Sequence, residues 1–219
     1  MQQNMSLTLH MHPLASYCWK VLIALYENET PFEKQIVNLA DGAERAGFRK
    51  LWPIGKFPVL RDSAADRVIP ESSNIIEYLA EFFPGKIALL PLAADAAREA
   101  RLRDRVYDLY VHEPMQKIVT DKLRPEGKSD PYGVELARTL LTTSYTMLDR
   151  EFMSKTWAAG EAFTLADCAA APALYYANLV QPFIAPFPNL GAYMKRLLER
   201  PSFVRVLTEA EPYFAQFPG

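Results

Sequence analysis

The chain opens with alternating apolar and polar positions and then changes to helical spacing. Positions 7–11 alternate as in a half-buried strand, and positions 18–26 carry apolar residues at helical intervals. Ser16 stands just before that helix and is a candidate N-cap. A second apolar strand at 32–37 completes a strand–helix–strand unit, which predicts two neighbouring parallel strands.

The rest of the first half predicts a short helix, a hairpin and a third long helix. Positions 43–51 have a weak helical pattern inside a segment that otherwise resembles a loop. Two short apolar pieces, 57–60 and 67–69, flank a polar turn and predict a β-hairpin. A helix is expected to start at the serines 72–73, one of them as its cap, and to stop at 84–85, which is Pro-Gly.

Strand signals disappear after the segment 83–91, and we expect a domain boundary there. The next helical pattern runs over 93–123, where Pro114 is expected to introduce a kink. Further helices are expected at 133–153, 165–178, 189–199 and 202–211. The predicted fold class is α/β plus all-α, with a first domain at 1–86 and an all-helical domain at 92–219.

Composition agrees with an ordinary globular protein: 219 residues, 50% hydrophobic and 23% charged, which excludes disorder, collagen and coiled coil. A net charge of −2 gives no reason to expect a nucleic acid or an acidic membrane as partner. The first basic residue is Lys20, so no signal peptide is expected, and no apolar run reaches the ~20 residues of a bilayer span. The two cysteines, Cys18 and Cys168, form no disulfide framework or zinc motif, which favours a cytoplasmic location.

Four strings of residues resemble the cytosolic glutathione S-transferase family, in particular its serine-type, bacterial and plant-like classes. They are HPLASYCWKVLIAL at 12–25, PIGKFPVL at 53–60, PESSNIIEYL at 70–79 and FTLADCAAAP at 163–172. The resemblance covers essentially the whole chain. It implies a thioredoxin-like domain that binds glutathione, followed by an all-helical domain that carries a pocket for an electrophile.

The resemblance also implies an activity, in which the glutathione thiolate is conjugated to a small, largely apolar electrophile. Glutathione is then the co-substrate, no metal is needed, and the protein is expected to be a cytoplasmic homodimer. Two other functions stay open. One is a non-catalytic glutathione-binding or stress-related interaction protein with the same fold, and the other is a glutaredoxin-like thiol oxidoreductase, for which Cys18 has no C-x-x-C partner.

The resemblance assigns two motifs to the glutathione backbone. The bond between Phe57 and Pro58 is expected to be cis, so that the Phe57 backbone pairs with the cysteinyl unit like an added strand. Glu71 and Ser72 begin a helix, where Ser72 can bind the γ-glutamyl carboxylate and Glu71 its ammonium. Taken alone, these residues also fit a trans strand start and plain helix capping.

Further assignments concern the glycyl carboxylate of glutathione and the electrophile pocket. Lys56 and Arg45 are candidate partners for the glycyl carboxylate of glutathione. Leu14, Tyr107 and Tyr110 are expected to line the electrophile pocket, the two tyrosines on condition that the 93–123 helix turns its apolar stripe toward the cleft. Core packing is the alternative for at least one of the two tyrosines.

The residue that stabilises the thiolate has three candidates in the turn after the first strand. A hydroxyl or a helix N-terminus beside a thiol favours the anion and lowers its pKa from about 8.5. The usual serine position of the family falls on Ala15, and Ser16 comes one residue later. We expect Ser16 to be catalytic, with Tyr17 and Cys18 as alternatives, although Ser16 also fits a simple cap and Cys18 a core position.

The remaining conspicuous residues are interpreted as structural. Thr164 and Asp167 have the spacing of a capping box, which stabilises the start of a helix. The histidines His10, His12 and His112 belong to no catalytic or metal-binding pattern that is visible along the chain.

Overall fold

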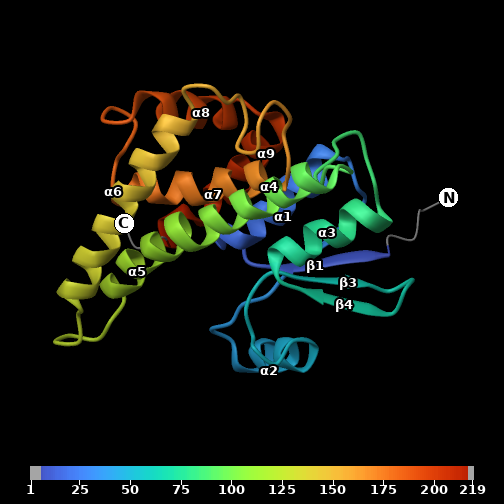
Figure 1. Cartoon of the computed structure of the whole chain (residues 1–219). Coiled ribbons are helices and arrows are strands. Elements are labelled where there is room, and N and C mark those ends of the chain that lie inside the picture. The colour runs from blue at the N-terminus through green and yellow to red at the C-terminus, as the bar shows by residue number, and fades with distance from the viewer. Residues whose placement is uncertain (1–5, 217–219) are drawn as a thin grey trace.

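A computed structural model describes residues 6–216 of the chain (Figure 1). An N-terminal domain with a small mixed sheet is followed by an all-helical C-terminal domain, as the sequence predicts. The elements in chain order are β1 (Leu7–Met11), α1 (Ser16–Glu27), β2 (Glu33–Ile36), α2 (Gly42–Leu51), β3 (Val59–Asp62), β4 (Arg67–Pro70), α3 (Ser72–Phe82), α4 (Ala94–Val106), η1 (Tyr107–His112), α5 (Glu113–Lys122), α6 (Pro131–Glu151), α7 (Leu165–Val180), α8 (Pro188–Leu198), α9 (Pro201–Ala210) and η2 (Glu211–Gln216).

The sheet has the strand order β2-β1-β3-β4. Strand β1 runs parallel to β2 and antiparallel to β3, so Leu9 lies between Lys34 on one side and Leu60 on the other. Strands β3 and β4 form the predicted hairpin. The predicted parallel pair of strands is therefore confirmed, and it places the turn between β1 and α1 at the end of a central strand.

Helix α1 lies between the sheet and the C-terminal helices, whereas α2 covers the opposite face of the sheet (Figure 1). Positions 18–25 of α1 are all buried. The Trp19 ring packs 4.8 Å from that of Tyr176 on α7 and 6.2 Å from that of Phe203 on α9. One hydrophobic core therefore continues through α1 from one domain into the other.

Two expected caps are wrong, because each serine lies inside its helix. Helix α1 begins at Ser16, and its N-cap is Ala15, which has no capping side chain. Helix α3 begins at Ser72, and its N-cap is Glu71, whose φ of 70° is in the left-handed region. Neither N-cap makes a side-chain hydrogen bond. The Ser16 hydroxyl is therefore not the capping group of α1.

The expected kink at Pro114 takes the form of a π-helical segment. Proline has no N–H to donate to the carbonyl four residues earlier, which here belongs to Tyr110. The segment η1 precedes Pro114 and interrupts the long helix between α4 and α5. Such wide turns often occur at functional sites.

The C-terminal helices agree with the sequence apart from one segment. Thr164 and Asp167 form the expected capping box at the start of α7, and Asp167 also accepts from Tyr193 at 2.7 Å. The 3-10 segment η2 after α9 has no counterpart in the prediction. Over residues 6–216, no helix is both long enough and apolar enough to cross a membrane.

Candidate active site

A cavity of about 920 Å³ opens beside the turn between β1 and α1. Its walls come from both domains. From the N-terminal domain it is lined by His12, Leu14, Ala15, Ser16, Tyr17, Asn38, Leu39, Ala40, Gly55, Lys56 and Phe57, and from the C-terminal domain by His112, Met115, Gln116, Val119, Thr120, Leu123 and Tyr176. We call this space the interdomain cleft. Its size is in the range of small-molecule sites.

Ser16 and His112 meet in the cleft. The Ser16 Oγ forms a short hydrogen bond with the His112 Nε2, although the two residues are 96 positions apart in the sequence. Both side chains line the cleft and both are buried. The structure thus brings His112, which is interpreted from the sequence as structural, into contact with the residue expected to be catalytic. No local pattern in the sequence could have paired the two.

His112 is neutral. Burial lowers its pKa to about 3, and the nearby Lys20 ammonium lowers it further in the same direction. The Tyr17 ring packs on the imidazole with a centroid distance of 4.1 Å. His12 also lines the cleft, stacked near Phe57 at 6.4 Å, whereas His10 packs against Phe48 outside it.

The two alternatives to Ser16 have raised pKa values. Burial raises the pKa of the Tyr17 hydroxyl, and the carboxylates of Asp108 and Glu113 raise it further. Burial raises the pKa of the Cys18 thiol to about 12. Cys18 has no exposed surface and packs in the core, so its core interpretation is confirmed and a reactive thiol at this position is disfavoured.

The sheet side of the cleft carries Phe57 and Lys56. The Phe57-Pro58 bond is cis, as expected. Phe57 precedes the first residue of β3, Val59, which pairs with His10, so its backbone lies outside the strand register. Lys56 lines the cleft next to it. Arg45, on α2, instead donates to the Leu39 carbonyl at 2.8 Å and is not among the described residues that line the cleft.

Glu71 and Ser72 lie at the start of α3, next to a buried cluster of charges. Glu71 is exposed and Ser72 is buried. Neither lines the cleft itself among residues 6–216, although the Glu71 carboxylate acts on the pKa of Tyr17. Behind them, Ser73 accepts from the Lys20 Nζ at 2.9 Å and donates to Asp104 at 2.7 Å.

Lys20 is the centre of this charge cluster. Its ammonium is 2.5 Å from an Asp104 oxygen and 2.9 Å from an Asp108 oxygen, and all three side chains are buried. Since Lys20 is on α1, Asp104 on α4 and Asp108 on η1, the cluster holds the two domains together next to the cleft. Burial raises the pKa of Asp108, and the ammonium of Lys20 opposes that effect.

The helical side of the cleft differs from the expectation. Leu14 lines the cleft, as expected. The assignment of Tyr107 and Tyr110 is wrong: Tyr107 is fully buried in the helical core, and Tyr110 is 47% exposed outside the cleft. The reason is the orientation of α4, whose Leu102 points to solvent at 51% exposure rather than toward the cleft.

Helix α5 supplies the apolar wall instead. The described residues of this wall are Met115, Val119 and Leu123, with Gln116 and Thr120 beside them. Tyr176 of α7 closes the site from behind, and its hydroxyl donates to the Leu14 carbonyl at 2.9 Å. The apolar residues of this wall are four positions apart, so the sequence could have indicated that they share one side of a helix. It did not show that this side faces the cleft.

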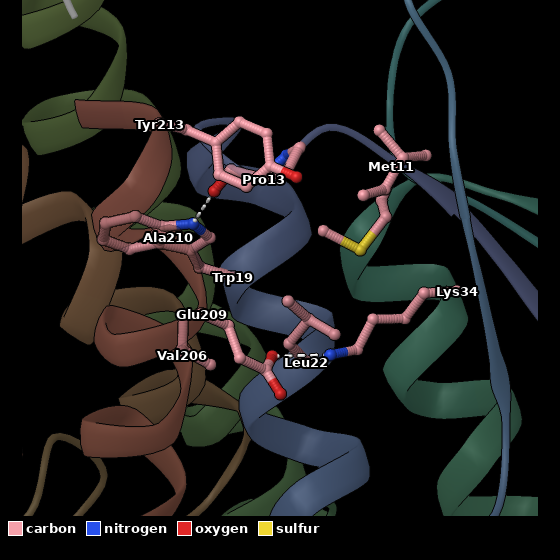
Figure 2. Close-up of a pocket in the computed structure, with 10 residues that line it drawn as sticks. Met11, Pro13, Trp19, Leu22, Lys34, Val206, Glu209, Ala210 and Tyr213 are labelled. Atoms are coloured by element: carbon pink, nitrogen blue, oxygen red, sulfur yellow. Dashed lines mark hydrogen bonds and ion pairs between the residues drawn. The ribbon is translucent and has the colours of Figure 1, made fainter. Parts of the chain in front are cut away.

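A second, smaller cavity of about 220 Å³ lies between β1, α1, β2 and α9 (Figure 2). Pro13 lines it, whereas the neighbouring His12 and Leu14 line the interdomain cleft. Lys34 forms an ion pair with Glu209 beside it at 2.6 Å, and the Trp19 indole donates to the Pro13 carbonyl at 2.6 Å (Figure 2). The ion pair joins β2 to α9, and the indole hydrogen bond holds the turn at Pro13.

Within residues 6–216, no group of three or more His, Cys, Asp or Glu side chains is placed to hold a metal ion.

Comparison with known proteins agrees with the fold. The family model for the glutathione S-transferase N-terminal domain matches residues 15–81, and the model for the C-terminal domain matches 113–201. The chain is 31% identical over 216 residues to the stringent starvation protein A homolog of Coxiella burnetii, with 97% of each chain covered. It is 27% identical over 189 residues to glutathione S-transferase GstB of Escherichia coli, covering 86% of this chain and 91% of that one.

A solved structure from the same family is similar to this chain. The crystal structure of a glutathione S-transferase from Methylobacillus flagellatus with GSH bound superposes with a TM-score of 0.83 at 26% identity, and it covers 92% of this chain and 98% of that one. The chain belongs to the glutathione S-transferase family.

Proposed function

We propose that this protein is a glutathione transferase that conjugates the glutathione thiolate to a small, largely apolar electrophile. The observation that carries the proposal is the Ser16 hydroxyl, which lies in the first turn of α1 and lines the interdomain cleft. A hydroxyl donor and the positive end of a helix dipole at one point favour an anion there. Because the chain belongs to the glutathione S-transferase family, we take this anion to be the glutathione thiolate.

Glutathione is placed along the N-terminal domain, 1–86. The cysteinyl backbone pairs with that of Phe57, which lies outside the strand register. The γ-glutamyl end reaches Glu71 and Ser72 at the start of α3, and the glycyl carboxylate approaches Lys56. Arg45 remains a second candidate for that carboxylate, provided that its bond to the Leu39 carbonyl is given up.

In this arrangement the chemistry is one nucleophilic step. The Ser16 hydroxyl donates a hydrogen bond to the thiolate, which raises the thiolate concentration at neutral pH. The sulfur then forms a bond to the electrophilic carbon, and the leaving group departs with the bonding electron pair. Ser16 neither gains nor loses a proton in this step, so its task is electrostatic.

The electrophile is placed in the part of the cleft built by the helical domain, 92–219. Met115, Val119 and Leu123 offer an apolar wall, and Leu14 faces it from the other domain. His112 is neutral, so it brings no charge to this part of the cleft. An uncharged, apolar co-substrate fits such a surface better than a charged one.

A homodimer is part of the proposal, as the family relationship implies. Large apolar side chains are exposed on three helices outside the cleft: Phe82 on α3, Leu102 on α4, and Leu136 and Leu140 on α6. Exposed large apolar side chains of this kind suit a protein–protein contact. Light scattering at micromolar concentration should give twice the mass of the 24.8 kDa chain, and the monomer mass would contradict this part of the proposal.

A non-catalytic glutathione-binding or stress-related protein is the second candidate. Two observations favour it: Ala15 occupies the position where the serine-type classes have their serine, and a stringent starvation protein A homolog is 31% identical to this chain. It predicts glutathione binding without turnover.

One experiment separates the two functions. Calorimetry measures glutathione binding, and turnover is measured with a generic aryl halide and, separately, with a disulfide. The transferase predicts binding and aryl halide turnover, with turnover reduced tenfold or more in Ser16→Ala. Ser154→Ala, a change of an exposed serine at the end of α6, serves as the matched control and should behave like the parent. Binding without any turnover would favour the second candidate.

A further inference from the structure

His112 reaches Ser16 because the long helix of the C-terminal domain is interrupted. Pro114 cannot donate to the Tyr110 carbonyl, and the Ser144 hydroxyl on α6 donates to that carbonyl instead, at 2.8 Å. That carbonyl therefore keeps a side-chain partner where the backbone opens into the π-helical segment η1. His112 is the last residue of η1, and its side chain lines the cleft.

The imidazole is held on two sides. The Ser16 Oγ forms a hydrogen bond with its Nε2, and the Tyr17 ring packs against it, tilted by 50°, with a centroid distance of 4.1 Å. Only 4% of His112 is exposed. A ring confined in this way has one orientation, so the position of its proton decides which partner donates.

The other ring nitrogen shows where that proton is. Nδ1 is buried and has no hydrogen-bond partner within the described part of the chain. If Ser16 donated to Nε2, a neutral ring would carry its proton on Nδ1, as a buried N–H without an acceptor. Proteins rarely leave a buried N–H unpaired, whereas an acceptor without a donor is tolerated more often.

We propose that His112 is a positioning residue, held as the neutral Nε2–H tautomer, which donates to the Ser16 Oγ and thereby leaves the Ser16 proton free for the thiolate. The part that concerns the thiolate rests on the proposed function. A hydroxyl whose oxygen accepts one hydrogen bond becomes a stronger donor in a second one. His112, Ser16 and the thiolate would therefore form a short chain of two hydrogen bonds. His112 neither takes nor gives a proton, and burial beside Lys20 keeps it uncharged.

The tautomer can be measured without glutathione. Nitrogen NMR on the isotope-labelled protein distinguishes a protonated from an unprotonated ring nitrogen, and comparison with His112→Gln assigns the signals. At neutral pH, we expect the proton on Nε2 and none on Nδ1. A proton on Nδ1, or a doubly protonated ring, would overturn the proposal whether or not the protein is a transferase.

The catalytic part is tested by a double-mutant cycle on aryl halide turnover. His112→Phe removes the donor and should lower kcat/KM roughly threefold to tenfold, raise the pKa of the bound thiol and leave glutathione affinity unchanged. His112→Gln keeps an N–H and should recover part of both effects. In a Ser16→Ala background neither change should matter, because His112 acts through Ser16.

The outcomes are distinguishable. An equal loss from His112→Phe with and without the Ser16 hydroxyl would overturn the proposal, since His112 would then act directly on the substrate. A parent protein that has no turnover and does not lower the thiol pKa would contradict the proposed function instead, and the NMR measurement would still decide the tautomer.

Discussion

The buried neutral histidine predicts that this protein loses stability in mild acid for one identifiable reason. His112 has a pKa of about 3 in the folded chain against an ordinary value of 6.5. At a pH between these two pKa values, His112 is protonated in the unfolded chain and unprotonated in the folded chain. Stability is therefore intact above pH 6.5 and falls as the pH drops below it.

The size of the effect follows from the distance to the unfolded pKa. At pH 5, the group is 1.5 units below 6.5, which at about 1.4 kcal/mol per unit costs about 2 kcal/mol of unfolding free energy. His112→Gln removes the titrating group and keeps an N–H of similar reach toward Ser16. Relative to the variant, the parent should therefore lose about 2 kcal/mol between pH 7.5 and pH 5.

The assay is urea unfolding of both proteins at several pH values, followed by circular dichroism and tryptophan fluorescence. Carboxylates and the other histidines titrate in both proteins, so their contributions cancel in the difference. His10→Gln is the matched control. His10 is half-buried, and burial lowers its pKa to a lesser extent, so its effect should be smaller. Parallel stability curves for the parent and His112→Gln would refute a buried neutral imidazole.

Three other predictions follow from the site. Ser72→Ala and Glu71→Gln should each weaken glutathione binding about tenfold, since a hydrogen bond to a charged group contributes ~1.5–3 kcal/mol; calorimetry that finds both variants equal to the parent would contradict their role at the γ-glutamyl end. Lys20→Met should cost about 3–5 kcal/mol in urea unfolding, because it leaves Asp104 buried without its cation and leaves Asp108 only the Arg105 guanidinium at 3.6 Å; a loss below about 1 kcal/mol would refute that account. Tyr17→Phe should leave the pKa of the bound thiol unchanged, because the Tyr17 ring packs against the His112 imidazole and Phe keeps that ring contact; a rise like that of Ser16→Ala would make Tyr17 the donor.

Local patterns were enough for most of the fold. The alternation at 7–11 and the apolar stripe after it predicted β1 and α1, since each element buries one face against the same core. The capping box of Thr164 and Asp167 was readable because both members belong to one helical turn. Helix starts were less accurate: Ser16 and Ser72 are good caps by residue type, but the chain uses both inside the helix.

The site was only partly predictable, because its two walls come from different domains. Ser16, Lys56 and Phe57 were found from motifs of the first half of the chain. Their partner His112 was not, since the contact depends on how η1 turns and not on any spacing in the sequence. The same limit explains the error at Tyr107. The apolar stripe through Leu102 was visible, but only the packed structure decides that this stripe points to solvent and that Tyr107 is buried in the helical core.

The pKa of the glutathione thiol in the bound state tests the central claim most directly. Ultraviolet titration of the thiolate in the complex measures it for the parent, Ser16→Ala and the control Ser154→Ala. The account predicts a value below the usual ~8.5 in the parent and in the control. In Ser16→Ala the pKa should rise by about one to two units, the equivalent of one lost hydrogen bond to an anion. The same thiol pKa in all three proteins would contradict the assignment of Ser16.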